Sequence, residues 1–377
     1  MSTASQPPPR EATRTVPDEL RGGTFEGPDV VTALLLYDAG TEHPLDPTKS
    51  QFVVGSAVDC DIAIESPFVS ARHCRLERRT LGLEVTDQGS KNGTYFEGKR
   101  EGDFFLRPGK TFVVGALPHR FLALNDEMRA HYPTLIDILG QPDEHSIRSE
   151  TPSPSDLILA AVHGAHMLIT SEAHCEQDRL AYIVHALSLL RARPMVELSQ
   201  VPVDRTKQLD LIRKRAAQST LVLDLGDNDV RLPTSFVTTA FSSRYRVRVL
   251  ALARTYEIAA EALGERYVRQ MQHVPLRPIA SRPEAVDRLL DRMFLQRNSK
   301  LRVSDMTSEN QSALRSYRWP DNYASLRDAA DRLTAIMRFG SVHKAALALK
   351  IPPATFYHWY TKTMRMTHPL TPSLQIT

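Results

Sequence analysis

Two short polar segments carry side chains that could bind a phosphate group. Ser70-Ala71-Arg72-His73 supplies a hydroxyl, a guanidinium and an imidazole, and Lys91-Asn92 follows further along the chain with an ammonium and an amide. A phosphate dianion is bound best by charge-assisted donors that loops hold on a rigid scaffold. The types and order of these residues therefore predict an anion-binding site. A phosphate-independent contact surface is the alternative.

The same segments resemble the motifs of the forkhead-associated (FHA) domain, a β-sandwich whose loops bind phosphothreonine peptides. The matching motifs are Val54-Gly55, Ser70-Ala71-Arg72-His73 and Gly89-Ser90-Lys91-Asn92-Gly93-Thr94. The resemblance covers roughly residues 30–125. It implies that Ser70 bonds the phosphate, that Asn92 holds the peptide backbone and that His73 is a buried structural residue.

One position departs from the family. The residue after the strand glycine is Arg in FHA domains, and Ser56 stands there in this chain. Losing a charged hydrogen bond to phosphate costs about 1.5–3 kcal/mol. Arg72 and Lys91 flank the predicted site, so either Arg72 compensates for the missing guanidinium or the surface has become phosphate-independent.

A second region resembles the strand–P-loop–helix of the AAA+ bacterial enhancer-binding proteins, the activators of sigma-54 RNA polymerase. The resemblance starts from the segment Met167–Asp178 and runs from about 157 to 337. Further matches are Thr220–Asp224 with the Walker B strand, Val247–Ala251 with the next core strand and Trp319-Pro320-Asp321-Asn322 with Trp-Pro-Gly-Asn. It implies an α/β, P-loop NTPase-like core followed by a helical lid-like region.

The residues that would hydrolyse ATP are absent from that region. A P-loop needs glycines to wrap the phosphates and a Lys to reach the terminal ones, but Gln177 stands at the Lys position. Leu225 follows Asp224 where a carboxylate should position water. The loop-glycine positions read Ser171, His174 and Glu176 and the later Arg position reads Ala324. We therefore expect a pseudo-ATPase, not an enzyme, with no cofactor.

Two further absences narrow the function. These activators contact sigma-54 through a Gly-Ala-Phe-Thr-Gly-Ala loop, and no such string occurs between Asp224 and Val247, so the resemblance excludes a conventional activator. The spacing of His163, His166, His174 and His185 matches no compact ligand pattern, so we expect no metal site.

The C-terminal region has the pattern of a helix pair. Val342, Ala345, Ala346 and Leu349 recur at helical spacing, and Phe356 and Tyr360 supply the buried face of a second helix. Residues 338–366 contain five Lys or Arg and no Asp or Glu. A basic cluster on such a motif is the electrostatic footprint of a duplex-DNA binder. A solvated basic helix pair that contacts protein is the alternative.

This region resembles the Fis-type helix-turn-helix that ends the enhancer-binding proteins. It departs from the family at Lys350, which stands in the turn where Gly is usual. The second helix of such motifs enters the major groove. The candidate DNA contacts are Lys344, Lys350, Thr355, His358, Trp359 and Lys362.

These residues require a multidomain scaffold. The 377-residue chain is 42% hydrophobic and 24% charged, which excludes global disorder. Short β-rich runs at 33–37, 51–54, 61–64, 74–78, 83–86 and 110–114 favour an antiparallel sandwich. We predict a disordered lead at 1–28, the all-β FHA sandwich at 29–126, a linker at 127–156, the α/β core at 157–282, the helical region at 283–337, the helix-turn-helix at 338–366 and a loose tail at 367–377.

The leading hypothesis is a cytoplasmic bacterial transcriptional regulator that binds double-stranded DNA as a homodimer or higher oligomer. Its FHA module would recognise a phosphothreonine-containing or acidic partner. No apolar run reaches the length needed to cross a bilayer, so we expect no membrane partner. The alternative is a phosphopeptide-binding adaptor in Ser/Thr kinase signalling with a vestigial helix-turn-helix.

Overall fold

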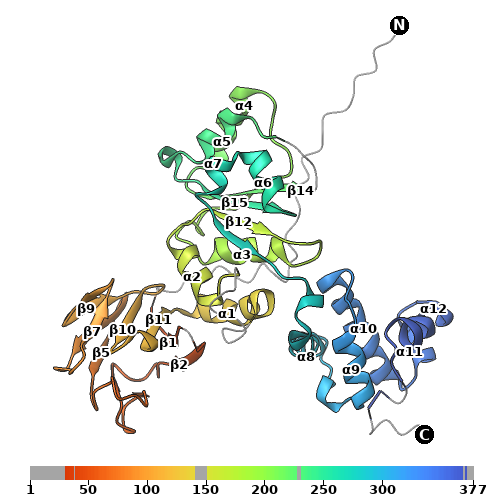
Figure 1. The fold of residues 1–377 in the computed structure, drawn as a ribbon, viewed down its shortest axis with the longest axis horizontal. Helices are drawn as coiled ribbons and strands as arrows, with labels where there is room; N and C mark the ends of the chain where they lie inside the picture. The colour runs from red at the N-terminus through yellow and green to blue at the C-terminus, as the bar shows by residue number, and fades with distance from the viewer. Residues whose placement is uncertain (1–29, 38, 141–150, 227–230, 368–369, 372–377) are drawn as a thin grey trace. The chain divides into compact units, whose positions relative to one another are not determined.

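The computed structural model describes residues 30–37, 39–140, 151–226, 231–367 and 370–371. The predicted lead at 1–28 lies outside the described residues. The chain divides into two compact units: residues 1–136, 141–170 and 178–274 form the first, and residues 137–140, 171–177 and 275–377 form the second. The first unit therefore contains both a β-sandwich and an α/β layer (Figure 1).

The N-terminal part is a sandwich of two sheets, as the sequence predicts. One sheet has the order β2(Thr41–Pro44)-β1(Ala33–Leu36)-β11(Arg120–Leu124)-β10(Thr111–Val114)-β7(Thr94–Phe96)-β8(Lys99–Arg100). The other has the order β4(Ile62–Ala63)-β3(Gln51–Gly55)-β5(Cys74–Arg79)-β6(Gly82–Asp87)-β9(Asp103–Leu106). Alternating apolar residues such as Leu34, Leu76 and Phe112 meet in its core. The loops between these strands present the polar residues of the predicted phosphate site.

The interval predicted as a linker is partly helical. Helix α1 spans Asp126–Leu139, and α2 begins at Pro154 and ends at Val162. Asn125 Oδ1 accepts a hydrogen bond of 2.9 Å from the Met128 amide, so a side chain satisfies the otherwise open start of α1. Ser153 and Asp156 form a reciprocal capping box at the start of α2. The linker prediction was therefore wrong for most of its described residues.

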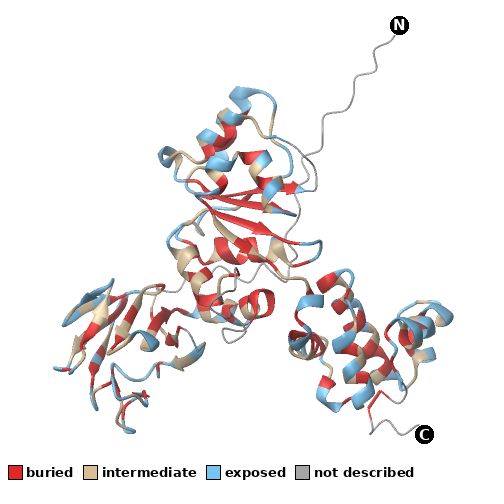
Figure 2. Ribbon diagram, in the orientation of Figure 1, coloured by how far each residue is buried: buried red, intermediate tan, exposed pale blue. Residues whose placement is uncertain are grey.

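The α/β part is built on a sheet with the order β13(Val196–Leu198)-β14(Thr220–Gly226)-β15(Arg248–Ala253)-β12(Met167–Thr170)-β16(Gln272–Pro275). The β13–β14, β14–β15 and β15–β12 pairs are parallel. Helices α4(Arg205–Asp210), α5(Thr234–Ala240), α6(Tyr256–Leu263) and α7(Glu265–Val268) lie on one side, and α2 and α3(Gln177–Ala186) lie on the other (Figure 1). Every residue of β12 and β15 is buried, as coverage of both faces requires (Figure 2).

The second unit is helical. Its elements are α8(Val286–Gln296), α9(Ser308–Ser316), α10(Asn322–Phe339), α11(Val342–Ala348), α12(Pro353–His358) and a π-helical turn at Trp359–Thr363. One apolar core runs through all of these helices. The predicted loose tail is wrong at its described residues, because Asn310 Nδ2 donates hydrogen bonds to the carbonyls of Thr367 and Leu370. Leu370 is completely buried.

Candidate functional site

The residues of the predicted phosphate site come from neighbouring loops of the sandwich. The Lys91 amide donates a hydrogen bond of 3.1 Å to Ser70 Oγ, and Asn92 Nδ2 donates one of 2.9 Å to the Phe68 carbonyl. The Ser56 amide donates to the Ser70 carbonyl at 3.0 Å. Because Ser70 Oγ accepts from backbone, its own hydroxyl proton is free to point outward toward an anion.

His73 fixes this arrangement from below. It is fully buried, as predicted, and its Nδ1 accepts the Ser70 amide at 3.1 Å while its Nε2 lies 3.0 Å from the Gly93 carbonyl. An accepting Nδ1 requires the proton on Nε2, so Nε2 donates to Gly93. The imidazole therefore joins the two loops that carry Ser70 and Asn92. Its place in the core excludes a role in proton transfer to a ligand.

The two cations near the site, Lys91 and Arg72, differ in whether a carboxylate pairs with them. Lys91 is exposed, and its ammonium has no hydrogen bond or ion pair to any residue in the described part of the chain. Arg72 instead forms a 3.1 Å ion pair with Asp59. This exposed pair directs the Arg72 guanidinium to a carboxylate, so Arg72 does not simply replace the Arg that the family has at the Ser56 position. Lys91 is the available cation.

A close backbone approach at Gly55 and the carboxylate of Asp87 hold the loops together. A Cβ atom at Gly55 would lie 2.1 Å from the Ala71 carbonyl oxygen, so only glycine allows the β3 end to approach the Ser70 loop. Asp87 receives hydrogen bonds from the Ser90 and Thr94 hydroxyls at 2.7 Å each. Burial works to raise the pKa of Asp87, but these hydrogen bonds outweigh it and leave that pKa below its ordinary value.

Sequence reasoning missed an apolar rim beside the polar cluster. Phe68 is 55% exposed and Leu117 is 76% exposed. The turn that contains Leu117 is tied to the Phe68 loop, because His119 Nε2 lies 2.8 Å from Ser66 Oγ. Isolated large apolar residues in loops carry no periodic signal in the sequence, although both stand beside prolines in otherwise polar segments. They provide a surface for apolar side chains next to the anion site.

The family model of the FHA domain matches residues 52–115, which contain all of these loops except the Leu117 turn. The chain contains an FHA domain. The FHA domain of CT664 from Chlamydia trachomatis is 28% identical and covers 25% of this chain and 95% of its own, with a TM-score of 0.23. EmbR from Mycobacterium tuberculosis, solved with a low-affinity phosphopeptide, is 22% identical and covers 25% of this chain and 24% of its own, with a TM-score of 0.22.

A structure of another class aligns over a longer stretch. NtrX from Brucella abortus is 16% identical over 49% of this chain and 48% of its own, with a TM-score of 0.37. No curated protein matches the chain.

Beyond the FHA domain, the loop at 171–177, which stands at the predicted P-loop position, is held by residues of its own unit. Asn322 at the start of α10 is buried, and its Nδ2 donates to the Ala173 carbonyl at 3.0 Å. The Tyr323 amide donates to the His174 carbonyl at 3.2 Å. Glu176, with a 9% exposed side chain, pairs with Arg327 of α10 at 2.7 Å. These contacts fasten the loop to the first turns of a helix.

The same loop keeps a backbone conformation that favours glycine. His174 has φ 60° and Glu176 has φ 66°, both in the left-handed region. Two residues with a Cβ atom therefore hold backbone conformations in which glycine would be favoured. Gln177, at the Lys position, accepts a hydrogen bond from the Ser171 hydroxyl, so its amide oxygen is engaged inside the loop.

The predicted Walker B residues lie at the end of β14. Asp224 is half-buried and its Oδ1 accepts the Gly226 amide at 3.1 Å, while Leu225 is buried. A bulge interrupts the β14–β15 pairing between Asp224 and Gly226. Leu225 packs in the core of the α/β part, so an apolar side chain occupies the position where a carboxylate would position water.

The C-terminal helices form a compact helix pair that continues from α10. Gly340, with φ 74°, ends α10, and the Ser341 hydroxyl caps α11 by accepting the Lys344 amide at 3.2 Å. Ala345 and Ala346 are fully buried, which lets the helices approach closely. Lys350 has φ 55° in the turn, which is the conformation that would make glycine favourable there.

The predicted DNA contacts fall into two classes. Lys344, Lys350, Thr355, His358 and Lys362 are exposed. Trp359 is only half-buried and packs against the core, with the Arg332 guanidinium 4.6 Å from its ring centroid. Trp359 stands three residues after Phe356 and next to Tyr360, so helical spacing itself places it on the packed side, and the prediction that it lies away from that side was wrong. Helix α12 ends at His358, and a π-helical turn follows. Leu349, predicted on the buried face, is 36% exposed.

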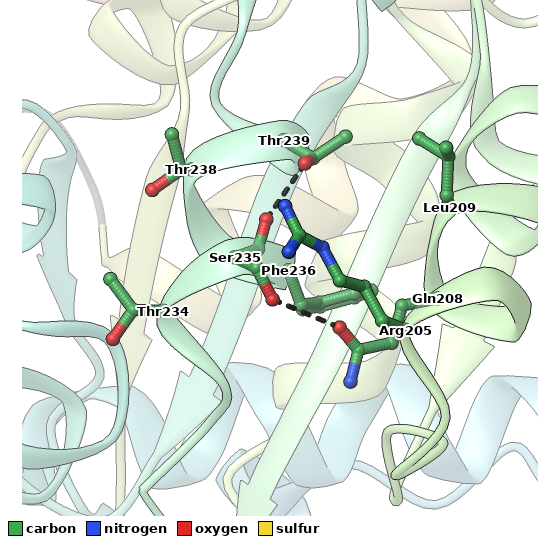
Figure 3. Close-up of a pocket in the computed structure, with 8 residues that line it drawn as sticks. All are labelled: Arg205, Gln208, Leu209, Thr234, Ser235, Phe236, Thr238 and Thr239. Atoms are coloured by element: carbon green, nitrogen blue, oxygen red, sulfur yellow. Dashed lines mark hydrogen bonds between the residues drawn. The ribbon is translucent and has the colours of Figure 1, made fainter.

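The α/β part also has an open cavity that no motif predicted. It measures about 300 Å³ and lies between α4 and α5 (Figure 3). Several of its polar atoms already bond to one another, because Ser235 Oγ donates to Gln208 Oε1 and Thr239 Oγ1 donates to the Ser235 carbonyl (Figure 3). Figure 3 shows the Arg205 guanidinium beside Ser235 and Thr239. These internal hydrogen bonds already engage polar atoms that a ligand would otherwise contact.

The described residues show neither a metal-binding cluster nor a membrane-spanning helix. They contain no group of three or more His, Cys, Asp or Glu residues placed to hold a metal ion. None of their helices is both long enough and apolar enough to span a bilayer.

Proposed function

We propose that this chain is a DNA-binding transcriptional regulator in which an FHA domain recognises a phosphothreonine-containing partner and an AAA+-like core neither hydrolyses ATP nor contacts sigma-54. The observation that carries the DNA-binding part is the exposed, basic and acid-free surface of the C-terminal helix pair. Residues 338–366 hold five cations and no carboxylate, and Lys344, Lys350 and Lys362 are all exposed. Phosphate contacts from such cations supply most of the affinity for duplex DNA.

The base-reading part of this proposal rests on α12. Thr355 and His358 project from that helix into solvent and have the polar side chains that can reach base edges. Lys350 precedes α12 and Lys362 follows it, so each is placed to contact phosphates on either side. Motifs of this kind act on paired half-sites, so we propose a homodimer as the DNA-binding form.

The phosphothreonine part rests on Ser70 and Lys91. The Ser70 hydroxyl proton is free because Oγ accepts from the Lys91 amide, and the Lys91 ammonium has no partner in the described part of the chain. A hydroxyl and an unpaired cation on adjacent loops suit a phosphate monoester. Phe68 and Leu117 would take apolar side chains of the same peptide.

Three residues support the proposal that ATPase activity has been lost. Gln177 replaces the phosphate-binding Lys, Leu225 replaces the water-positioning carboxylate, and Glu176 adds a negative charge to the loop. The pairing of Glu176 with Arg327 and of Asn322 with the Ala173 carbonyl holds that loop by contacts of its own unit. We propose that this region is a scaffold and that DNA occupancy, rather than remodelling of polymerase, is the mechanism.

The experiment is a gel-shift with genomic fragments at moderate salt, using the full chain and two variants. Lys344→Gln with Lys362→Gln removes two exposed cations of the helix pair, and Lys300→Gln removes one exposed cation of the same unit outside it. We expect shifted fragments with wild type and Lys300→Gln and strongly reduced shifts with the double variant. If wild type shifts no duplex, the regulator proposal fails. Titration calorimetry with Mg-ATP should give no saturable heat.

One observation favours a second function, an FHA-based adaptor in Ser/Thr kinase signalling. Helix α12 covers only Pro353–His358, and Trp359 is held by Arg332 against the core, so the surface for reading bases is short. A chain that binds phosphothreonine peptides but no duplex would have this function. The same gel-shift, together with a phosphothreonine peptide library, separates the two.

A further inference from the structure

A second basic surface lies on the α/β part, far along the sequence from the helix pair. The parallel strands β13, β14 and β15 all begin at one edge of their sheet, and the segments 188–196, 211–219 and 241–248 lead into them. These three segments contain eight Lys or Arg and no Asp or Glu. The sequence pattern does not reveal this cluster, because only the sheet brings the three segments together.

Hydrogen bonds show that the three segments are neighbours. Ser219 Oγ donates to the Pro194 carbonyl at 2.6 Å, which joins the approach to β13 with the approach to β14. The Gln218 amide donates to the Tyr245 carbonyl at 2.9 Å, which joins the approach to β14 with the approach to β15. Arg193 is therefore next to one junction, and Arg244 and Arg246 flank the other.

Some basic residues of these segments have structural roles. Arg248 is buried and donates hydrogen bonds to the carbonyls of Ala161 and Val184, near the C-terminal ends of α2 and α3. Arg191 pairs with Glu127, and Lys214 pairs with Asp210 at 2.7 Å. These charges are already compensated and cannot account for a binding surface.

Four other cations of these segments are not used in this way. Arg193, Arg213, Arg244 and Arg246 are exposed, and none of their guanidinium groups makes a hydrogen bond or ion pair with a residue in the described part of the chain. If they served only to cap helix ends, they would bond the terminal carbonyls as Arg248 does. Four uncompensated guanidinium groups around two joined turns are a local excess of positive charge, although Arg244 also contacts the Tyr245 ring.

We infer that this surface, which we call the sheet-edge patch (Arg193, Arg213, Arg244 and Arg246), binds the phosphate backbone of duplex DNA without reading sequence. Guanidinium groups suit phosphate oxygens, and the absence of carboxylates in the three segments removes repulsion from a polyanion. A duplex is favoured over a small anion because the cations are spread over three segments of the chain. The choice of DNA rests on the proposed function of the helix pair, which would deliver a duplex to the same molecule.

The experiment uses the full chain and a labelled mixed-sequence duplex of about 60 base pairs, with affinity measured by fluorescence anisotropy over a salt series. The patch variant carries Arg193→Gln, Arg213→Gln and Arg244→Gln. The control variant carries Arg75→Gln, Lys99→Gln and Arg231→Gln, which remove the same charge from exposed positions elsewhere in the first unit. Arg246 is left in place because its φ of 51° makes any substitution a backbone perturbation as well.

We expect the patch variant to lose at least about tenfold in affinity at 0.1 M salt and to flatten the salt slope by about 2–3, at roughly 0.9 for each lost phosphate contact. The control variant should match wild type. Equal loss in the patch and control variants would overturn the inference, because it would show a general charge effect. Equal competition by polyglutamate and by unlabelled duplex would also overturn it by assigning the surface to acidic proteins.

The helix-pair variant Lys344→Gln with Lys362→Gln, measured on the same duplex, distinguishes this inference from the proposed function. Loss of affinity in the helix-pair variant alone overturns the sheet-edge patch and leaves the helix-turn-helix proposal intact. Loss in the patch variant alone supports the patch and counts against the helix pair. Loss of affinity in both variants supports both the helix-pair proposal and the sheet-edge patch. Unchanged circular dichroism and melting of the patch variant check that it is folded.

Discussion

Replacing His174 with glycine should stabilise the second unit, although glycine substitutions usually destabilise. His174 has φ 60° in the loop at 171–177, its side chain is exposed, and it has no side-chain hydrogen bond to a described residue. The left-handed conformation costs about 1–2 kcal/mol for a residue with a Cβ atom. Glycine removes that cost but loses about 0.5–1 kcal/mol more backbone entropy on folding. The net expectation is a gain of about 0.5–1 kcal/mol.

The assay follows from where the tryptophans lie. The chain has 2 Trp, Trp319 and Trp359, and both belong to the second unit, as does the loop at 171–177. Tryptophan fluorescence during urea unfolding therefore reports on the unit that contains His174. We expect His174→Gly to raise the urea midpoint without changing the slope of the transition.

Ala173→Gly is the matched control. Ala173 is exposed in the same loop and is not among the residues with positive φ, so glycine there should cost about 0.5–1 kcal/mol. Opposite signs at adjacent positions would show that the loop keeps the backbone of a P-loop without its glycines. If His174→Gly destabilises as much as Ala173→Gly, the reasoning about this loop is refuted.

Three further outcomes follow from the contacts described above. Ser70→Ala should weaken phosphothreonine-peptide binding by about 10–100-fold in titration calorimetry, since it removes a hydrogen bond to a charged group worth about 1.5–3 kcal/mol; an unchanged affinity would place the phosphate elsewhere. Arg327→Met should cost about 1–2 kcal/mol by tryptophan-monitored unfolding, because it removes the ion pair of the nearly buried Glu176 with Arg327, and the usual buried-pair cost is reduced for the half-exposed Arg327. Glu176→Gln in the same background should recover part of that cost. Asp87 has a lowered pKa, so its stabilisation is complete above its unfolded pKa, about 4, and is lost as pH falls through the folded pKa. The amide-exchange protection factors across 52–115, which correct for the intrinsic exchange rate at each pH, should therefore fall below about pH 4 in wild type and less steeply in Asp87→Asn.

Sequence reasoning succeeded where a local signal was strong. The predicted β-rich runs fall on β1, β3, β4, β5, β6 and β10, and the predicted sandwich is confirmed. The buried positions of His73, Phe356 and Tyr360 were also predicted correctly. In each case, either a spaced motif or an apolar periodicity identified the element without knowledge of its partners.

Other elements could not be found in this way. Strands such as β7 and β8 have only three and two residues, too few for an alternating pattern, and their pairing comes from neighbours in the sheet. Helix α1 contains Pro133 and begins in a polar segment, which made it resemble a linker; the cap by Asn125 was the available signal.

In the candidate site, too, some features could be predicted from the sequence and others could not. Motif residues such as Ser70 and Asn92 could be placed from the sequence, but the pairing of Arg72 with Asp59 depends on how two loops meet. The role of Arg327 was missed because it supplies a charge to Glu176 from far along the chain. The sheet-edge patch is the extreme case, since its four residues come from segments that only the parallel sheet assembles.

The most direct test of the regulator proposal is a footprint of the full chain on the genomic fragment that it binds most strongly in the gel-shift. A dimeric helix-turn-helix predicts two protected half-sites about 10–10.5 base pairs apart, or a multiple of that spacing, on one face of the duplex. The footprint should disappear in Lys344→Gln with Lys362→Gln, persist in Lys300→Gln and be unchanged by Mg-ATP. A footprint that survives the double variant, or that forms only with Mg-ATP, would contradict the proposal that a basic helix pair reads DNA without ATP hydrolysis.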